Sequence, residues 1–257
     1  MLADLAAAHP AVAEDFAEAS EGAGVDLWAL AQQGPQERLD TTEFTQPALL
    51  AAGVAVYRLW LAQGGPRPAV VAGHSLGALM APRVAERAPE LAGLILIAAP
   101  ARPLQDIVLQ QVKYLAASDG DLAPEEQAGI EDIANKAAAV ATLSADTPAS
   151  DTLLGLPAAY WIDLRTYDPI TVARTLPQPI LVLQGGRDYQ VTADGDFARW
   201  QAAFAGDARV RLERFPALNH LMIAGAGPSS PQEYALEGHV DNAVIDAIAG
   251  FVGKAQP

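Results

Sequence analysis

The sequence predicts an α/β fold built on a parallel sheet, with helices before the sheet and a helical cap inserted into it. Four short apolar runs after residue 67 have the length and composition of buried strands, and helical patterns alternate with them. Strands joined by crossover helices pair in parallel. About eighty residues, 101–177, separate the second run from the third, and an insertion of that length usually forms a lid or cap.

The chain is predicted to divide into a helical segment, 1–67, and a core domain, 68–257. Apolar residues recur at helical spacing in 10–22, which ends in glycine, and in 41–65, which is the longest helical pattern. In the longer pattern Thr45 is the expected N-cap, a proline falls near the first turn, and two glycines close the helix.

The core domain is predicted to alternate strands with helices. The strands are expected at 68–73, 91–100, 178–186 and 208–216. The helices are expected at 76–89, 194–206 and 239–253. The first strand has no predicted neighbour earlier in the chain, so we expect it to lie at an edge of the sheet.

The composition excludes several kinds of chemistry. A formal net charge of −15 argues against a nucleic-acid partner, because phosphate binding needs clustered Lys and Arg. The absence of cysteine excludes thiol catalysis and disulfides. The four histidines are scattered and predict no metal site, and no organic cofactor is expected. No apolar stretch is long enough for a membrane span, and the first residues do not read as a signal peptide, so a cytoplasmic location is expected.

The motif GHSLG, residues 73–77, stands where the first predicted strand turns into a helix. A serine hydroxyl is a weak nucleophile, so it needs a base to take its proton and a donor for the oxyanion that forms. A tight turn between strand and helix exposes the hydroxyl of Ser75 and requires small neighbours, which Gly73 and Gly77 supply. The backbone N–H of Leu76, at the start of the helix, is the expected oxyanion donor.

A general base and an orienting acid are expected after the nucleophile, in the order Ser, Asp, His. Asp188 follows the third predicted strand in GGRDYQV, and His220 follows the fourth in FPALNHLMI. Because the carboxyl ends of parallel strands meet at one edge of a sheet, both side chains should lie near Ser75. His220 would then accept and return the proton, and Asp188 would fix its tautomer. The alternatives are a turn-forming or capping role for Asp188 and a loop position without catalysis for His220.

The remaining titratable candidates have simpler explanations. His74 should point away from the nucleophile and is expected to be structural, and His239 marks the start of the last helix. Asp194 and Asp196 are expected to cap the helix that follows them. The rival acids in the cap segment are Asp163 and Asp168.

The cap segment contains the densest aromatic stretch of the chain, LPAAYWIDLRTYDP at 156–169. Tyr160 and Trp161 are predicted to line a pocket for the acyl group of a substrate. The alternative is that these rings, together with Tyr167, only pack the cap onto the core domain.

Four segments carry a resemblance to a known family, and they are GHSLGALMAPRVAERAPELAGLILIAAPARPLQD, LLGLPAAYWIDLRTYDP, QPILVLQGGRDYQVT and FPALNHLMIAGAGPSSPQEY. With them, about residues 73–257 resemble a bacterial α/β-hydrolase of the serine esterase type, similar to dienelactone hydrolase. The resemblance implies an α/β-hydrolase-like sheet, truncated at its N-terminal side. It also implies Ser75 as nucleophile, Asp188 as acid and His220 as base.

A second resemblance covers residues 1–77. It is carried by MLADLAAAHPAVAEDFAEASEGAGVDLWALAQQGPQERLDTTEFTQPALLAAGVAVYRLWLAQGG and by the following VVAGHSLG, which are similar to the N-terminal part of malonyl-CoA:acyl carrier protein transacylase. Both families contain the motif GHSLG. The chain is therefore interpreted as a hybrid that is joined at a shared nucleophile motif.

Each family's pattern is incomplete in this chain. Transacylases have Glu directly after the motif, where this chain has Ala78, and an Arg for the malonyl carboxylate close to the position of Pro100. The first strands of the hydrolase, with the loop that gives its second oxyanion donor, are replaced by transacylase helices. Leu76 is then one donor, and we predict that the loop around Gln46 approaches Ser75, as its counterpart does in transacylases, and partly substitutes for the missing donor.

Together these observations predict a serine carboxylic-ester hydrolase that acts on small or short-chain esters through an acyl-enzyme. Two alternatives stay open, namely an acyltransferase of acyl-CoA or acyl carrier protein thioesters, like malonyl transacylase, and a folded hybrid without catalysis. The expected partner is a small-molecule ester, with no nucleic acid and no membrane. The edge at 68–73 predicts a homo-oligomer that forms through this strand, or coverage of the strand by the N-terminal helices.

Overall fold

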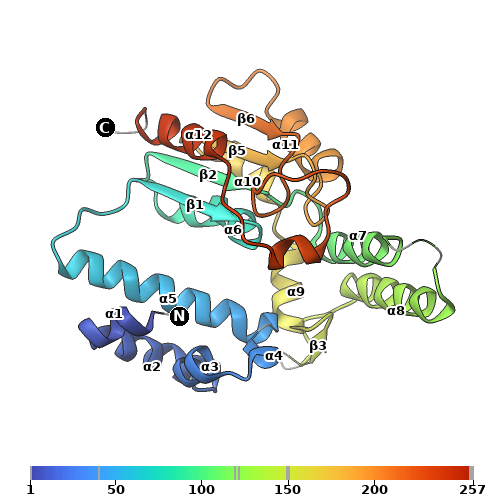
Figure 1. Cartoon of the computed structure of the whole chain (residues 1–257), viewed down its shortest axis with the longest axis horizontal. Helices are drawn as coiled ribbons and strands as arrows, with labels where there is room; N and C mark the ends of the chain where they lie inside the picture. Colours follow the sequence, from blue (N-terminus) through green and yellow to red (C-terminus); the bar gives the residue numbers. More distant parts are fainter. Residues whose placement is uncertain (1, 40, 119, 121, 149–150, 255–257) are drawn as a thin grey trace. The chain divides into compact units, whose positions relative to one another are not determined.

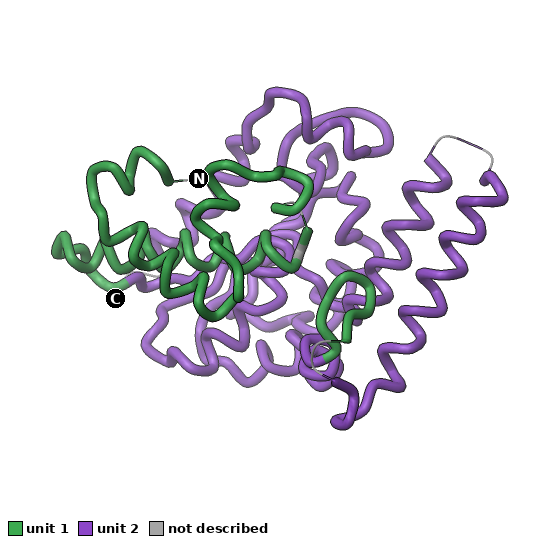
Figure 2. Tube along the Cα trace, turned by 90° about the horizontal axis from the view of Figure 1, so that it is seen from below, with its two compact units in different colours: residues 1–67, 149–158 green, residues 68–148, 159–257 purple. Residues whose placement is uncertain are grey.

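The computed structural model describes residues 2–39, 41–118, 120, 122–148 and 151–254. The chain forms two compact units, shown in Figure 2. Unit 1 comprises residues 1–67 and 149–158, and unit 2 comprises residues 68–148 and 159–257. The division falls at residue 67, and part of the predicted cap segment, 149–158, therefore belongs to unit 1.

Unit 1 is helical and has a core of its own. Its helices are α1 (Ala3–Ala8), α2 (Ala11–Ala23), α3 (Leu27–Gln33), α4 (Gln36–Leu39) and α5 (Thr42–Ala62), and its two short strands are β3 (Thr152–Leu153) and β4 (Leu156–Pro157). Phe16 of α2 and Leu27 of α3 are fully buried against an alanine-rich face of α5. Small alanines on that face let the helices approach closely, and this packing explains why α5 is alanine-rich.

The long helix α5 begins earlier than the sequence predicts. Thr41, not Thr45, occupies the N-cap position, and the backbone N–H of Thr45 already donates to the carbonyl of Thr41 at 2.9 Å. The hydroxyl of Thr45 donates back to the same carbonyl at 2.9 Å. The prediction of Thr45 as N-cap is therefore wrong, because its hydroxyl bonds backwards along the helix instead of accepting from a later N–H.

Unit 2 is built on a four-stranded parallel sheet with the order β1-β2-β5-β6 (Figure 1). The strands are β1 (Val70–His74), β2 (Gly93–Ile97), β5 (Ile180–Gly185) and β6 (Val210–Phe215). In this register Val71 lies opposite Leu94, and Leu94 opposite Ile180. All four predicted strands are confirmed, and β1 lies at an edge of the sheet.

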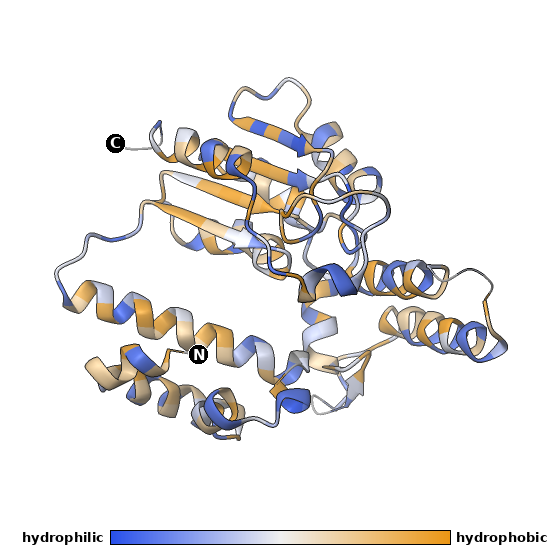
Figure 3. Ribbon diagram, viewed as in Figure 1, coloured by the Kyte–Doolittle hydropathy of each residue, from blue (hydrophilic) through white to orange (hydrophobic). Residues whose placement is uncertain are grey.

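Helices cover both faces of this sheet, and the alternation of side chains along each strand separates two cores. Leu94, Leu96 and Val182 face one core with α6 (Leu76–Arg87), α10 (Pro169–Thr175) and α11 (Ala198–Ala203). Ile95 and Leu181 face the other core with α12 (Asn242–Val252). Figure 3 shows β2 and β5 as largely apolar and β6 as mixed. Continuous burial of the two central strands is what a parallel sheet with helices on both faces requires.

The helices of unit 2 follow the strand–helix alternation. They are α6 (Leu76–Arg87), α7 (Leu104–Ala116), α8 (Pro124–Val140), α9 (Ala158–Arg165, whose first residue lies in unit 1), α10 (Pro169–Thr175), α11 (Ala198–Ala203) and α12 (Asn242–Val252). The helix predicted at 194–206 starts instead as a π-helical turn, Ala193–Phe197. A short 3₁₀ helix, Pro231–Ala235, lies in the segment before α12. None of the helices in the described part of the chain has the length and apolar character of a membrane span.

Candidate active site

Ser75 occupies a strained turn between β1 and α6. Its backbone angles are φ 55° and ψ −119°, in a region that residues other than glycine rarely adopt. The N–H of Ser75 donates to the carbonyl of Ile97 in β2 at 2.9 Å, and its own carbonyl accepts from Leu79 at the start of α6, at 3.0 Å. Strand pairing and the helix therefore fix the turn from both sides, as a strained position requires.

The two glycines of the motif have different roles. A Cβ on Gly73 would lie 2.3 Å from the carbonyl carbon of Gly77, so the end of β1 and the start of α6 meet backbone against backbone. A Cβ on Gly77 would meet nothing within 4 Å. The steric requirement for glycine thus falls on Gly73, whereas Gly77 leaves open space beside Ser75.

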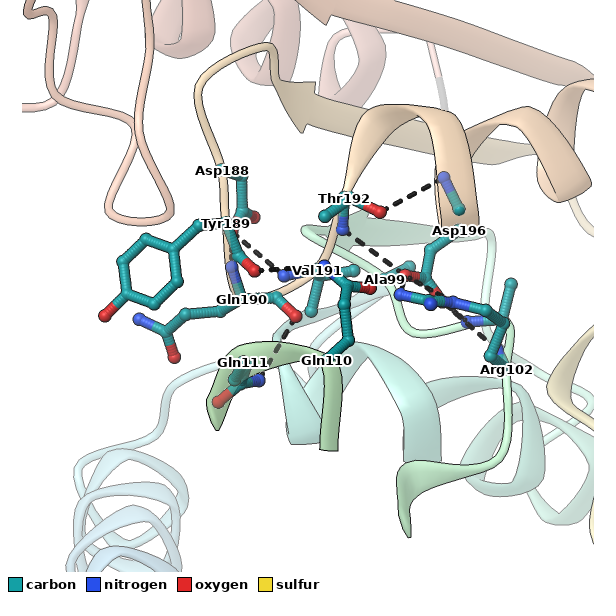
Figure 4. A network of polar contacts seen from close by, with 12 residues as sticks. Ala99, Arg102, Gln110, Gln111, Asp188, Tyr189, Gln190, Val191, Thr192 and Asp196 are labelled. Carbon is teal, nitrogen blue, oxygen red and sulfur yellow. Dashed lines mark hydrogen bonds and ion pairs between the residues drawn. The ribbon is translucent and has the colours of Figure 1, made fainter. Parts of the chain in front are cut away.

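Asp188 and His220 form a buried pair. His220 Nδ1 lies 2.8 Å from Asp188 Oδ2, and the two side chains are 5% and 0% exposed. The same carboxylate oxygen accepts from Gln184 Nε2 at 3.2 Å, and Oδ1 accepts from the N–H groups of Gln190 and Val191 at 2.8 and 3.0 Å. These donors fix the carboxylate, part of whose loop is drawn in Figure 4, so that it orients the imidazole through Nδ1.

Two glycines allow the loop that carries Asp188 and the loop that carries His220 to meet. A Cβ on Gly185 would lie 2.5 Å from the carbonyl oxygen of Asn219, and one on Gly186 would lie 2.6 Å from the Cα of Pro216. The main chain after β5 therefore lies directly against the main chain after β6. Side chains at these positions would force the loops apart, so the Gly-Gly pair before Asp188 is a condition for its contact with His220.

Glu233 links the two loops from a third segment and was not predicted from the sequence. It pairs with Arg187, the residue before Asp188, at 2.5 Å, and accepts from Asn219, the residue before His220, at 3.2 Å. The hydrogen bond from Arg187 is the main cause that lowers the pKa of Glu233. Because its partners lie far away in the sequence, no local pattern marks Glu233.

The loop that carries His220 lies beside the turn at Ser75. His74, which precedes Ser75, has its Nε2 2.8 Å from the carbonyl oxygen of His220, and the centroids of the two rings are 4.6 Å apart. Within the described residues, the hydroxyl of Ser75 makes no hydrogen bond. Hydrogen bonds between nucleophile and base are often long in free enzymes and shorten when substrate binds.

The two predicted oxyanion donors lie in different units. Leu76 is the first residue of α6, so no carbonyl within the helix can accept from its N–H. Gln46 is an exposed residue near the start of α5 in unit 1. The role of Gln46 therefore stays a prediction.

Tyr160 and Trp161 lie on α9. Trp161 is 1% exposed, and the half-buried Tyr160 meets it edge to face with ring centroids 6.0 Å apart. A cavity of about 280 Å³ in the same unit is lined by neighbouring segments, among them Leu79 and Tyr167, and its described lining includes neither predicted residue. A substrate-binding role for Tyr160 and Trp161 thus stays a prediction.

Asp196 does not cap a helix, which corrects the expectation from sequence. The cap position belongs to Thr192, whose hydroxyl accepts from Gly195. Asp196 is fully buried and bonds to the loop after β2, where it accepts from the backbone of Ala101 and pairs with Arg102 at 2.6 Å (Figure 4). A buried carboxylate needs such partners, and here its hydrogen bonds join the segment that follows Asp188 to the loop after β2.

The rival acids of the cap segment have structural partners. Asp163 pairs with Arg83 of α6 at 2.5 Å, and Asp168 caps α10 by accepting from Ile170. Across the described residues, no group of three or more His, Cys, Asp or Glu side chains is arranged to hold a metal ion.

Comparison with known proteins supports two relationships. Residues 1–139 match the model of the acyl transferase domain family. The chain belongs to this family. It is 65% identical to the malonyl CoA-acyl carrier protein transacylase of Escherichia coli over 77 residues. This aligned stretch covers 30% of this chain and 25% of that protein. The match to the domain family extends past residue 77, which was the predicted end of the resemblance.

The second relationship is to an esterase. The chain is 42% identical to esterase EstD of Thermotoga maritima over 185 residues. This aligned stretch covers 72% of this chain and 42% of EstD. The chain thus spans less than half the length of either curated relative, and the predicted hybrid of two families is confirmed.

Solved structures were also found. A Thermogutta terrifontis esterase is 19% identical, with a TM-score of 0.43 over 80% of this chain and 72% of that one. A malonyl-CoA:acyl carrier protein transacylase from Xanthomonas oryzae is 28% identical, with a TM-score of 0.32 over 91% of both chains. Neither superposition is close enough to support a conclusion about this chain.

Proposed function

We propose that the chain is a serine carboxylic-ester hydrolase that acts on small or short-chain esters. Ser75 attacks the acyl carbon, His220 takes the proton and returns it to the leaving alcohol, and Asp188 holds the imidazole. The N–H of Leu76 donates to the oxyanion, Tyr160 and Trp161 contact the acyl group, and water then releases the acid from the acyl-enzyme.

The observation that carries this proposal is the buried contact of 2.8 Å between Asp188 and His220, on a loop that also touches the residue before Ser75. The strained backbone of Ser75 supports the same role. The name of the Thermotoga maritima relative, an esterase, agrees with it.

The test is hydrolysis of p-nitrophenyl acetate and butyrate. Activity should disappear in Ser75→Ala and His220→Ala, and a fluorophosphonate should label wild-type Ser75. His239→Gln is the matched control, because His239 is exposed at the start of the α12 segment. A wild-type chain that is folded but takes no fluorophosphonate label would refute the proposal and favour a folded hybrid without catalysis.

A second candidate is an acyltransferase, which the match of residues 1–139 to the acyl transferase domain favours. Such an enzyme would move an acyl group from a CoA thioester to Ser75 and then to a carrier protein. Transfer from malonyl-CoA to acyl carrier protein without ester hydrolysis would select this function over the first.

We also propose that two copies pair through the edge of β1. An apolar groove of about 370 Å³ lies beside this edge and is lined by Val70, Ala72 and Ile95 with residues of α12. An unpaired strand edge with apolar neighbours favours association. Light scattering should report a dimer at micromolar concentration, and Ala72→Lys should give a monomer. A wild-type monomer across that range would refute the dimer.

A further inference from the structure

His74 connects the nucleophile strand to the base. It is the last residue of β1, and its Nε2 lies 2.8 Å from the backbone carbonyl of His220, 146 residues further along the chain. A carbonyl only accepts, so Nε2 must carry the proton. The contact therefore holds the main chain of the residue whose side chain serves as base in the proposed function.

Other hydrogen bonds of the loop that carries His220 lie within the loop or join it to Asp188 and Glu233. Asn219 accepts from the N–H groups of Leu221 and Ile223, at 3.0 and 3.1 Å, and its own carbonyl accepts from Met222. These bonds give the loop its form but do not set its distance from β1. The hydrogen bond from His74 supplies that link, because β1 ends at the nucleophile turn.

We propose that His74 is a positioning residue for His220, and that it works as the neutral imidazole protonated on Nε2. It holds the base loop against the nucleophile turn, so that the imidazole of His220 stays within reach of Ser75. The proposal rests on the proposed hydrolase function, since it assigns His220 the role of base.

The charge of His74 matters as well as its hydrogen bond. Partial burial of the ring and, second, the facing ring of His220 lower the pKa of His74, while Asp188 on the neighbouring loop acts in the opposite direction. The neutral form is therefore the stable one near pH 7. When His220 takes the proton of Ser75, a neutral neighbour 4.6 Å away does not repel the new positive charge, whereas a charged one would.

The experiment compares His74→Gln with His74→Phe. The amide of Gln can donate from nearly the same place as Nε2 but does not titrate, and Phe keeps a ring without a donor. Gln should keep kcat within a few-fold. Phe should lose about 10–100-fold in kcat with KM little changed, because a small displacement of the base costs that much. The amide of Gln is neutral like the imidazole that it replaces, so the acid limb of kcat/KM should stay at the pH of the wild type.

A readout that does not need catalysis separates this inference from the proposed function. The Nδ1 proton between His220 and Asp188 should give a low-field NMR signal in the wild type and the Gln variant, and it should broaden or vanish in Phe. If the wild type hydrolyses no ester but the signal behaves in this way, the positioning role stands and the hydrolase function falls. If Phe keeps both its signal and a kcat within twofold of wild type, the positioning role is refuted. Should circular dichroism show that Phe is unfolded, His74→Ala takes its place with the same criteria.

Discussion

Replacing Asp196 by Asn is expected to destabilise unit 2 by about 3–5 kcal/mol, because one partner of a buried ion pair is removed. The carboxylate is fully buried, and Arg102 is 17% exposed. Oδ1 accepts from the backbone N–H groups of Ala101 and Arg102 at 2.9 and 3.1 Å. Oδ2 accepts from Nε and Nη2 of Arg102 at 3.2 and 2.6 Å, and from the N–H of Thr192 at 3.3 Å.

The magnitude follows from these contacts. An Asn that keeps its oxygen in the Oδ1 position preserves the two backbone bonds, but its NH₂ group then faces the donors of Arg102 and Thr192. The 3.3 Å hydrogen bond from Thr192 is lost, and with it the two from the charged guanidinium of Arg102, which are worth about 1.5–3 kcal/mol each. Their sum, about 3–6 kcal/mol, is reduced because the guanidinium of Arg102 keeps some access to water.

Urea denaturation followed by tryptophan fluorescence measures the loss. Trp200 is fully buried in unit 2 and donates to the carbonyl of Ala99. Ala99 lies on the loop after β2, to which Asp196 also bonds, so the fluorescence of Trp200 reports on this region. Asp194→Asn is the matched control, since Asp194 is exposed in the same π-helical turn and its substitution should change the unfolding free energy by no more than about 0.5 kcal/mol. A loss in Asp196→Asn below about 1 kcal/mol, or equal to that of the control, would refute the reasoning.

Four further substitutions test the site. Because Arg187 lowers the pKa of Glu233, the ion pair stabilises the folded wild type at pH 7, and this stability is lost as the pH falls through the lowered pKa. Glu233→Gln should therefore have a lower melting temperature at pH 7, and its melting temperature should fall less on acidification. If the melting temperatures of the two proteins fell in parallel across that range, the reasoning would be contradicted. Gly185→Ala should lower kcat on p-nitrophenyl butyrate about 100-fold, since its Cβ would lie 2.5 Å from the main chain before the base, and an unchanged kcat would contradict it. Gly73→Ala should abolish folding or fluorophosphonate labelling, whereas Gly77→Ala should fold normally by circular dichroism. If the two variants had equal effects on folding and labelling, the turn would not be packed as described.

The strands and the order of the site residues were predictable because they depend on short stretches of sequence. Apolar runs such as 91–100 and 178–186 are continuous since both faces of a central strand are buried, and that property needs no knowledge of the partners. Parallel pairing then brings the loops after β5 and β6 to one edge, so the proximity of Asp188 and His220 follows from topology alone.

The long-range polar partners could not be predicted in this way. Asp196 is followed by a helix, like an ordinary cap, and only the fold places it against Arg102. Glu233 lies in a polar segment where nothing separates it from a solvated surface residue until Arg187 and Asn219 are brought to it. In both cases a carboxylate finds its partners through contacts between segments far apart in the chain, and one sequence carries no trace of such contacts.

The shared motif explains how two families can meet in one chain and still leave a consistent site. The turn at Ser75 depends on Gly73, on pairing with β2 and on the start of α6, and all of these lie within or after the motif. Asp188 and His220 also come after it, so the part of the chain from the motif onward contains all three residues that we propose as the catalytic triad. The segment before the motif is the predicted source of the second oxyanion donor. Losing one such donor costs about 3–4 kcal/mol of transition-state stabilisation in a well-studied protease, which sets the scale of the rate that Gln46 or its neighbours would have to restore.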